Sequence, residues 1–209
     1  MIAAETITDE CFLVRNALDL QEQVELSAYI ASRDNTTASN GTAMMPAPRT
    51  LILGEDGVTP TVTYRRGDAS IVTTLVDKII AFLKNVGLGE MSIANDIATY
   101  ASVSMATIRY HAPDGRFPPH IDHCKGSAVC LFSLGRSANF MVRGNADEQA
   151  RRFQMHSGDV LVFNASSEAK ILHGVEGIDL GASDIGEELS KIDRVFQMHR
   201  YGVQCRLRF

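Results

Sequence analysis

The sequence contains no tryptophan, and none of its four cysteines belongs to a C-x-x-C pair. This spacing predicts free thiols in a reducing compartment. No apolar run approaches the ~18 residues that are needed to span a membrane. The first segment, MIAAETITDECF, lacks the charged start and the apolar stretch of a secretory signal. We therefore expect an intracellular protein, cytoplasmic or nuclear, without membrane contact.

A basic excess is also absent. The chain has 20 Lys and Arg against 25 Asp and Glu, a formal net charge of -5. No global field attracts nucleic acid, so any such contact must be local. The length of 209 residues suits a single domain over 1–209, and 45% hydrophobic residues are enough to build its core. We expect this domain to be a monomer.

Two stretches have the pattern of amphipathic helices. In DLQEQVELSAYIASRD, 19–34, Asp19 is followed three residues later by Glu22, which is the pattern of a capping box. In DASIVTTLVDKIIAFLKNVG, 68–87, apolar residues recur at helical spacing and Gly87 provides a stop. The segment between these helices is rich in Gly, Pro, Thr and Asn, which predicts loops with short strands.

From residue 98 onward the sequence changes to short β-rich runs separated by turn residues. This pattern of short strands and turns is typical of a sandwich, barrel or jelly roll. We therefore predict a mainly β protein with flanking helices. An acidic stretch, 179–193, is expected to be a surface loop. The β-rich runs are ATIRYHA, SAVCLFSL, NFMVRG, RRFQMH, DVLVFN, KILHGV and RVFQMHRYGVQCRLRF.

The segment FPPHIDHCKG, 117–126, places His120 and Asp122 two residues apart. On a strand, such residues point to the same face, so the imidazole and the carboxylate would converge. The pair is either a simple hydrogen-bonded contact or part of a metal site. His173, in the run KILHGV, is the best candidate for a third ligand. Two histidines and one carboxylate leave coordination positions open for O2, as in the facial triad of non-haem Fe(II) oxygenases.

At these residues the sequence resembles the AlkB family of Fe(II)/2-oxoglutarate dioxygenases. HID followed by His173 matches the H-x-D…H triad of the family. Tyr110 in IRYHAPDG matches the tyrosine of its N-x-Y-x-P-G segment. Arg200 and Arg206 in RYGVQCR match the arginines of its R-x-N-x-x-x-R strand. Two further segments resemble the family, SLGRSANFMVRG and MHSGDVLVFNASSEAKILHGV.

The resemblance implies a double-stranded β-helix, or jelly-roll, core over 98–209, with N-terminal helices and a substrate lid in 1–97. It implies Fe(II) bound by His120, Asp122 and His173, and no catalytic residue beyond these ligands. The co-substrate would be 2-oxoglutarate, which is oxidised by O2 to succinate and CO2.

The same resemblance implies how the co-substrate is held. Arg200 would bind its distal carboxylate through a planar fork, helped by the hydroxyl of Tyr110. Arg206 would lie nearer the chelating end of 2-oxoglutarate and Asp122.

Family members oxidise N-alkyl groups on nucleobases, and the hydroxylated alkyl leaves as an aldehyde. We therefore expect methylated DNA or RNA as the substrate. The contacts expected for it are Tyr64, Arg65 and Arg66, in the lid segment 45–69, and His123 and Cys124, which follow the ligand aspartate.

Three positions depart from the family pattern. Ile108 stands where an asparagine is expected before Tyr110, and Gly202 stands where an asparagine is expected between the arginines. Cys124 replaces an acidic residue that contacts the target base in bacterial members, and a thiol is a poor acceptor. These changes affect the substrates more than the metal.

Other functional classes stay open at this point. An oxygenase of the same family that acts on a protein side chain, a small molecule or a lipid would fit the acidic pI and the lost base contact. A non-catalytic jelly-roll binding module would not need an intact triad. Two histidines and a carboxylate also suit catalytic zinc in a hydrolase, which would give Arg200 and Arg206 no role.

Overall fold

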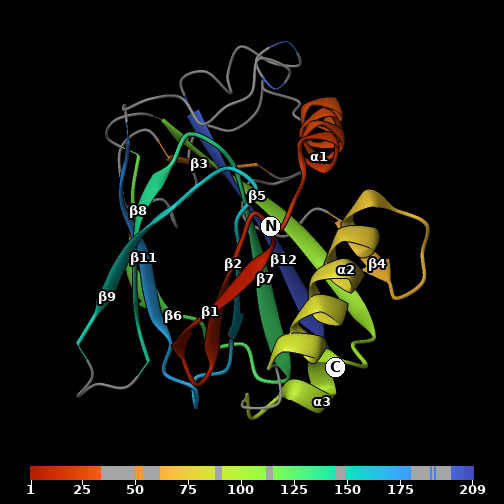
Figure 1. Ribbon diagram of the computed structural model, residues 1–209, viewed down its shortest axis with the longest axis vertical. Coiled ribbons are helices and arrows are strands. Elements are labelled where there is room, and N and C mark those ends of the chain that lie inside the picture. The colour runs from red at the N-terminus through yellow and green to blue at the C-terminus, as the bar shows by residue number, and fades with distance from the viewer. Residues whose placement is uncertain are drawn as a thin grey trace.

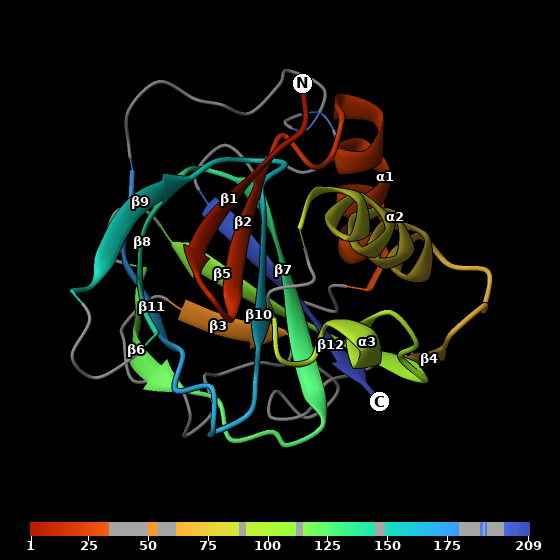
Figure 2. The ribbon, with the colours of Figure 1, turned by 60° about the horizontal axis from the view of Figure 1, so that its bottom comes forward.

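The computed structural model describes residues 1–33, 50–53, 62–87, 91–111, 115–144, 149–179, 189, 191 and 199–209. Two antiparallel sheets face each other, and two long helices cover the outer face of the larger sheet (Figures 1 and 2). The prediction of a mainly β, jelly-roll-type fold with flanking helices is confirmed.

The larger sheet has eight strands, in the order β1-β2-β10-β7-β12-β5-β3, with β4 also paired to β5. Its central strand β7 is buried at each of its 9 residues, as expected for a strand covered on both faces. The C-terminal strand β12 lies between β7 and β5. The bounds are β1 Ala3–Thr8, β2 Cys11–Arg15, β3 Thr50–Leu53, β4 Val62–Arg65, β5 Ser102–His111, β7 Ser127–Gly135, β10 Val160–Asn164 and β12 His199–Arg208.

The smaller sheet has four strands in the order β6-β11-β8-β9. It faces the inner side of the larger sheet, and side chains of both sheets line the space between them. Its strands are β6 Phe117–Ile121, β8 Ala138–Arg143, β9 Arg151–Met155 and β11 Leu172–Ile178.

Alternate residues of the larger sheet belong to two separate cores. On β12, Tyr201, Val203 and Leu207 pack on the helix side, together with apolar residues of both long helices. On β7, Val129 and Leu131 point the other way and pack with the smaller sheet. This period-2 alternation decides which side chains of β5, β7 and β12 can reach the space between the sheets.

The helices are α1 (Leu20–Arg33), α2 (Ile71–Val86) and the short α3 (Ala94–Ile97). The predicted capping box is confirmed, because the Asp19 amide donates to Glu22 Oε2 at 2.8 Å and the Glu22 amide donates to Asp19 Oδ1 at 2.9 Å. Gly87 ends α2, with its amide donating to the Leu83 carbonyl at 3.0 Å. None of the described helices is long and apolar enough to cross a membrane.

Two strands precede the first helix, although the sequence analysis assigned none there. The hairpin β1–β2 extends the larger sheet beyond β10. Residues 11–14 of β2 are all buried, so the strand is a short continuous apolar run without alternation. Periodicity alone cannot separate such a run from a piece of buried helix.

The expected lid and the expected acidic loop lie largely outside the described residues. Of the lid segment 45–69, the structure describes β3, β4 and 66–69, and both strands pair with β5. Of the acidic stretch 179–193, it describes Asp179, Leu189 and Lys191.

The turn before β10 connects the N-terminal hairpin to the rest of the sheet through one buried carboxylate. Asp159 is 2% exposed and accepts hydrogen bonds from Arg15 Nη1 at 2.9 Å and from the Asn16 amide at 3.0 Å. It also accepts from the His156 amide at 2.9 Å. Arg15 Nη2 lies 3.8 Å from a second carboxylate, that of Glu5, which is 51% exposed.

Replacing these two carboxylates should have different effects. Asp159→Ala should lower the free energy of unfolding by about 3 kcal/mol, since the arginine and two backbone amides lose a buried acceptor. Glu5→Ala should lower it by less than about 1 kcal/mol, because solvent screens an exposed pair. Urea denaturation of both variants measures the difference. Equal losses would contradict the importance assigned to the buried turn.

Candidate metal centre

A cavity of about 540 Å³ lies between the two sheets. The larger sheet contributes alternate residues to its wall, among them Ile108, Leu131 and Gln204. The smaller sheet contributes Phe140 and Val175. The wall is therefore mainly apolar, with a few polar groups from the inward faces of the strands.

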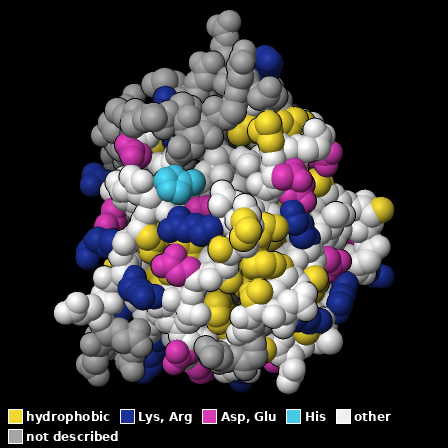
Figure 3. Space-filling model, in the orientation of Figure 1, with side chains coloured by type: hydrophobic (Ala, Val, Ile, Leu, Met, Phe, Trp, Pro, Cys, Tyr) yellow, Lys and Arg dark blue, Asp and Glu magenta, His cyan; other side chains and the backbone are white. Residues whose placement is uncertain are grey.

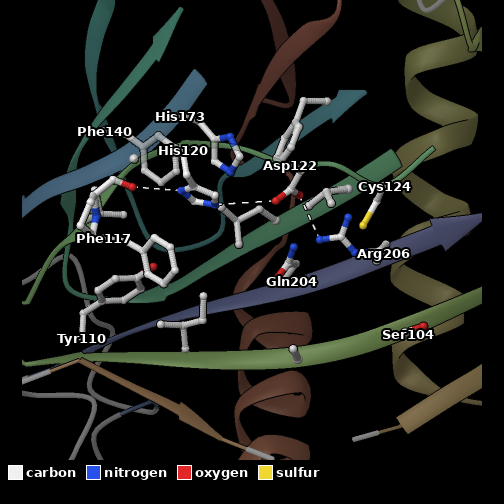
Figure 4. A pocket seen from close by; sticks show the side chains of 18 of the residues that line it. Ser104, Tyr110, Phe117, His120, Asp122, Cys124, Phe140, His173, Gln204 and Arg206 are labelled. Carbon is white, nitrogen blue, oxygen red and sulfur yellow. Dashed lines mark hydrogen bonds and ion pairs between the residues drawn. The ribbon is translucent and has the colours of Figure 1, made fainter. Parts of the chain in front are cut away.

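The three predicted metal ligands converge in this cavity (Figure 4). One donor atom from each of His120, Asp122 and His173 lies within 4.8 Å of the other two. The two histidines are direct cross-strand partners on β6 and β11, with ring centroids 4.3 Å apart. Asp122 follows the end of β6, and its Oδ1 is 3.7 Å from His120 Nε2.

Both imidazoles are oriented by backbone carbonyls. His120 Nδ1 is 3.0 Å from the Pro118 oxygen, and His173 Nδ1 is 3.1 Å from the Ile171 oxygen. A carbonyl oxygen can only accept, so each Nδ1 carries a proton, and in a neutral imidazole this arrangement leaves the lone pair on Nε2. Metal-bound histidines are commonly oriented by such contacts of the second ring nitrogen.

His173 is kept neutral by its surroundings. Its side chain is buried, and the Phe163 ring packs against it with centroids 4.4 Å apart. Burial, and after it the neighbouring His120, lower the pKa of His173 to about 4. A histidine must be unprotonated to bind a metal, so this environment favours the ligand form.

A glycine permits the close approach of β6 and β11. A Cβ atom on Gly174 would lie 2.8 Å from the Phe117 oxygen and 2.9 Å from the Pro119 nitrogen. These are backbone atoms, which cannot rotate away. The residue beside His173 must therefore be glycine if the two histidines are to face each other at this distance.

Asp122 is held by an arginine of the opposite sheet. Arg206 Nη2 donates to Asp122 Oδ2 at 3.0 Å, and both side chains are 14% exposed. Asp122 Oδ1 stays directed toward His120 (Figure 4). Arg206 Nη1 is buried and has no hydrogen-bond partner among the described residues.

Arg200 is fully buried, and part of its guanidinium is left without a partner. Its Nη1 donates to the Ser133 hydroxyl and, at 3.3 Å, to the Met155 carbonyl. In the described part of the chain, its Nε and Nη2 have no acceptor. Burial lowers the pKa of Arg200 to about 10, so the group is still a cation at neutral pH. A buried cation with two free donors fits the two oxygens of a carboxylate.

Tyr110 pairs with Arg200 across β5 and β12 and lines the cavity. Burial raises the pKa of its hydroxyl, which therefore remains protonated and can donate. Ile108 and Gly202, two of the departures from the family pattern, are also direct cross-strand partners. A Cβ atom on Gly202 would lie 3.3 Å from Tyr110 Cε2, so the tyrosine ring covers the glycine.

Only some of the residues expected to contact the substrate lie at the cavity. Cys124 lines the cavity, and the exposed His123 precedes it. Tyr64 packs on the helix side of the larger sheet, where its hydroxyl is hydrogen-bonded to that of Tyr29.

The two arginines that follow Tyr64 are separated by the sheet. The guanidinium carbon of Arg66 lies 5.2 Å from the centroid of the Tyr100 ring, and Tyr100 belongs to the helix-side core. Arg65 is one residue away from Tyr64 on β4, so it points to the opposite face. Only Arg65 of this pair lies on the face that bears the cavity.

Three side chains in or near the cavity were not predicted from the sequence. Gln204 and Ser104 line the cavity beside Arg206, and Ser133 orients Arg200. The two-residue spacing of Gln204 from Arg206 could have identified it, since both lie on one face of β12. Ser104 and Ser133 needed the strand register.

The comparisons with known proteins agree with this site. The family model of the 2OG-Fe(II) oxygenase superfamily matches residues 10–206, and the chain belongs to that superfamily. It is therefore an oxidoreductase of the dioxygenase type, with Fe(II) and 2-oxoglutarate as its cofactor and co-substrate. No protein of curated function matches the sequence.

Solved structures show the same fold over nearly the whole chain. The structure of OsALKBH1 is similar with 19% identity and a TM-score of 0.67 over 99% of each chain. A prolyl-4-hydroxylase of Pseudomonas putida is similar with 13% identity and a TM-score of 0.55, over 96% of this chain and 93% of that one. A Trichoplax adhaerens prolyl hydroxylase, in complex with a hypoxia inducible factor peptide fragment, has 10% identity and a TM-score of 0.55, over 96% and 84%. The fold expected from the AlkB resemblance is thereby confirmed.

Gly174→Ala should weaken metal binding. The added methyl would push β6 away from β11 and separate the two histidines, so we expect Mn(II) affinity to fall roughly 10- to 100-fold, as for lost ligand orientation. Isothermal titration with Mn(II) measures the change.

Gly67→Ala is the matched control for this variant. Gly67 has a positive φ of 86°, but a Cβ there would meet nothing within 4 Å, and it lies in the turn after β4. This change should cost about 1 kcal/mol of stability and leave Mn(II) affinity as in the parent. If both variants lose affinity alike, stability rather than strand spacing decides metal binding.

Proposed function

We propose that this oxygenase removes methyl groups from N-alkylated nucleobases of DNA or RNA by oxidation. The observation that carries the proposal is the convergence of His120, Asp122 and His173 at one point of a cavity that Arg206 also lines. The cavity volume of about 540 Å³ is in the usual range for a small-molecule site. The resemblance of the sequence motifs to the AlkB family supports the assignment to nucleic-acid chemistry, and OsALKBH1 shares the fold.

The metal ligands would be His120 Nε2, His173 Nε2 and Asp122 Oδ1. The carbonyls of Pro118 and Ile171 would keep both Nε2 atoms directed at the ion, and Arg206 would keep the second oxygen of the carboxylate occupied. When bound, Fe(II) and 2-oxoglutarate supply with O2 the oxidising chemistry that side chains lack.

The distal carboxylate of 2-oxoglutarate would be bound by the free Nε and Nη2 of Arg200 and by the Tyr110 hydroxyl. The two guanidinium nitrogens are buried and have no acceptor among the described residues, so a carboxylate would supply the hydrogen bonds that they lack. Ile108 and Gly202 offer no side-chain donor here, so the site would depend on fewer hydrogen bonds than the family pattern provides.

The substrate base would enter from the end of the cavity that bears Cys124. The thiol is a poor acceptor, so selectivity among methylated bases should be looser than in relatives with an acidic residue there. The face of the molecule in Figure 3 intermixes Lys and Arg with Asp and Glu. Together with the net charge of -5, this supports short-footprint binding without strong affinity for DNA in general.

An oxygenase that hydroxylates a protein side chain is the second candidate. The mainly apolar cavity wall and the two prolyl hydroxylases that share the fold favour it. Incubation with Fe(II), 2-oxoglutarate and air, followed by mass spectrometry, separates the two candidates. Formaldehyde from methylated DNA or RNA oligomers supports demethylation, whereas turnover of peptides alone would overturn it.

We further propose that residues 1–209 act as one domain, as a monomer in the cytoplasm or nucleus. The N-terminal and C-terminal strands lie in the same sheet, which supports a single folding unit. Size-exclusion chromatography with light scattering tests the monomer, and a dimer would contradict it.

Asp122→Ala should abolish the decarboxylation of 2-oxoglutarate while the protein stays folded. The change removes one of three metal ligands and leaves Arg206 without its carboxylate partner. Succinate formation measures the activity, and circular dichroism checks the fold. Decarboxylation at the parent rate would mean that the ligand set is wrong.

Arg200→Lys should weaken 2-oxoglutarate binding roughly ten- to a hundred-fold, because an ammonium cannot reproduce the planar fork and each hydrogen bond to a buried charge contributes about 1.5–3 kcal/mol. Calorimetric titration with Mn(II) in place of Fe(II) measures the affinity. An unchanged affinity would show that Arg200 is not the anchor.

A further inference from the structure

We propose that Arg65, Ser102 and Arg208 form a phosphate-binding strip at the mouth of the cavity. The strip would bind the sugar-phosphate backbone of a nucleic-acid substrate whose methylated base enters the cavity. This inference rests on the proposed function and assigns to it a surface for the part of the substrate outside the cavity.

Strand register places these three residues in one row. Arg65 on β4 and Arg208 on β12 are both direct partners of Ser102 on β5. Directly opposite residues of paired strands point to the same face. With neighbouring strands about 4.8 Å apart, the Cα atoms of the two arginines lie about 10 Å from each other, with the serine between them.

The row lies on the face of the larger sheet that bears the cavity. Tyr64 and Leu207, the neighbours of the two arginines, both pack in the helix-side core. Arg65 and Arg208 therefore point the other way, and Arg208 is among the residues that line the cavity.

The polar groups of the strip are exposed or half-exposed and are not used within the protein. In the part of the chain that the structure describes, neither guanidinium forms a hydrogen bond or an ion pair. Asp68 binds the backbone amide of Arg65 at 2.7 Å, and not its guanidinium. Arg206, in contrast, donates to Asp122. The two guanidinium groups and the serine hydroxyl between them can donate hydrogen bonds to phosphate oxygens, which Arg and Ser side chains commonly contact.

The strip is adjacent to the metal centre and remote from the co-substrate anchor. One step of two residues along the strands, about 7 Å, leads from Ser102 and Arg208 to Ser104 and Arg206. Figure 4 shows Ser104, Arg206 and Cys124 toward one end of the cavity and Tyr110 toward the other. At strand rise, Arg208 is about 27 Å from Arg200, so the strip does not duplicate the site for 2-oxoglutarate.

A local strip also fits the charge of the whole chain. The net charge of -5 repels a polyanion at long range, so the attraction must come from a few placed cations. The ends of β4 and β12 lie together near the C-terminus and α3, away from β9 and β6 (Figures 1 and 2). A nucleic-acid strand bound there would cross the mouth of the cavity.

The test measures binding of a short, fluorescein-labelled, methylated single-stranded oligonucleotide to the Mn(II)-loaded protein with 2-oxoglutarate, by anisotropy over a series of salt concentrations. Arg65→Ala and Arg208→Ala should each weaken binding about three- to tenfold. Each should also make the slope of log K against log salt less steep by about 0.7, the change for one lost phosphate contact on a single strand. The double variant should lose about twice that slope.

Arg66→Ala is the matched control, since it removes the same charge from the neighbouring residue on the other face of the sheet. It should bind the oligonucleotide with the affinity and salt slope of the parent. A second readout is the ratio of kcat/KM for the methylated oligonucleotide to kcat/KM for the corresponding methylated nucleoside. The strip variants should lower this ratio, because the nucleoside has no phosphate to bind.

The outcomes separate this inference from the proposed function. If the parent demethylates the oligonucleotide but the strip variants keep its affinity and salt slope, the strip is overturned and the demethylase function stands. Equal losses in Arg66→Ala would likewise overturn it, since position on the sheet would then not matter. If the parent neither binds nor demethylates oligonucleotides or nucleosides, the proposed function itself fails, and the strip with it.

Discussion

A buried, charged guanidinium is the constraint on which the rest of the structure depends. Arg200 is fully enclosed, yet two of its nitrogens have no acceptor among the described residues. Burying a cation without full compensation is expensive, and a core selected for stability alone would place an apolar residue there. The supports around it, Ser133 and the Met155 carbonyl, hold the group in place without neutralising it. Such a core keeps a position ready for an anionic ligand.

Residues along the single strand β12 have different roles in the two-sheet arrangement. The inward residues of β12 run from Arg200 through Gly202 and Gln204 to Arg206 and Arg208. Arg200 is the proposed co-substrate anchor, Arg206 donates to the carboxylate of Asp122, and Arg208 lines the cavity. The outward residues of the same strand fill the helix-side core. Period-2 geometry thus lets one strand carry both the chemistry and the packing.

The departures from the family pattern are linked in space. Ile108 and Gly202 replace two expected asparagines and are cross-strand partners, and the Tyr110 ring covers the glycine. A side chain at Gly202 would bring its Cβ within 3.3 Å of Tyr110 Cε2, so the ring would have to shift slightly to accept it. The two departures therefore lie side by side in the sheet, next to the arginine and the tyrosine of the proposed co-substrate site.

The sequence by itself predicted both long helices, the β-rich second half and His120 and Asp122 as metal-ligand candidates, because caps, periodicity and the H-x-D spacing are local signals. It could not determine the strands before α1, whose apolar run has no period. It treated Arg65 and Arg66 as equivalent, whereas the sheet puts them on opposite faces. Only tertiary structure decided that His173 faces His120 and that Arg208 shares a row with Arg65, because strand register is set by contacts between residues far apart in the chain.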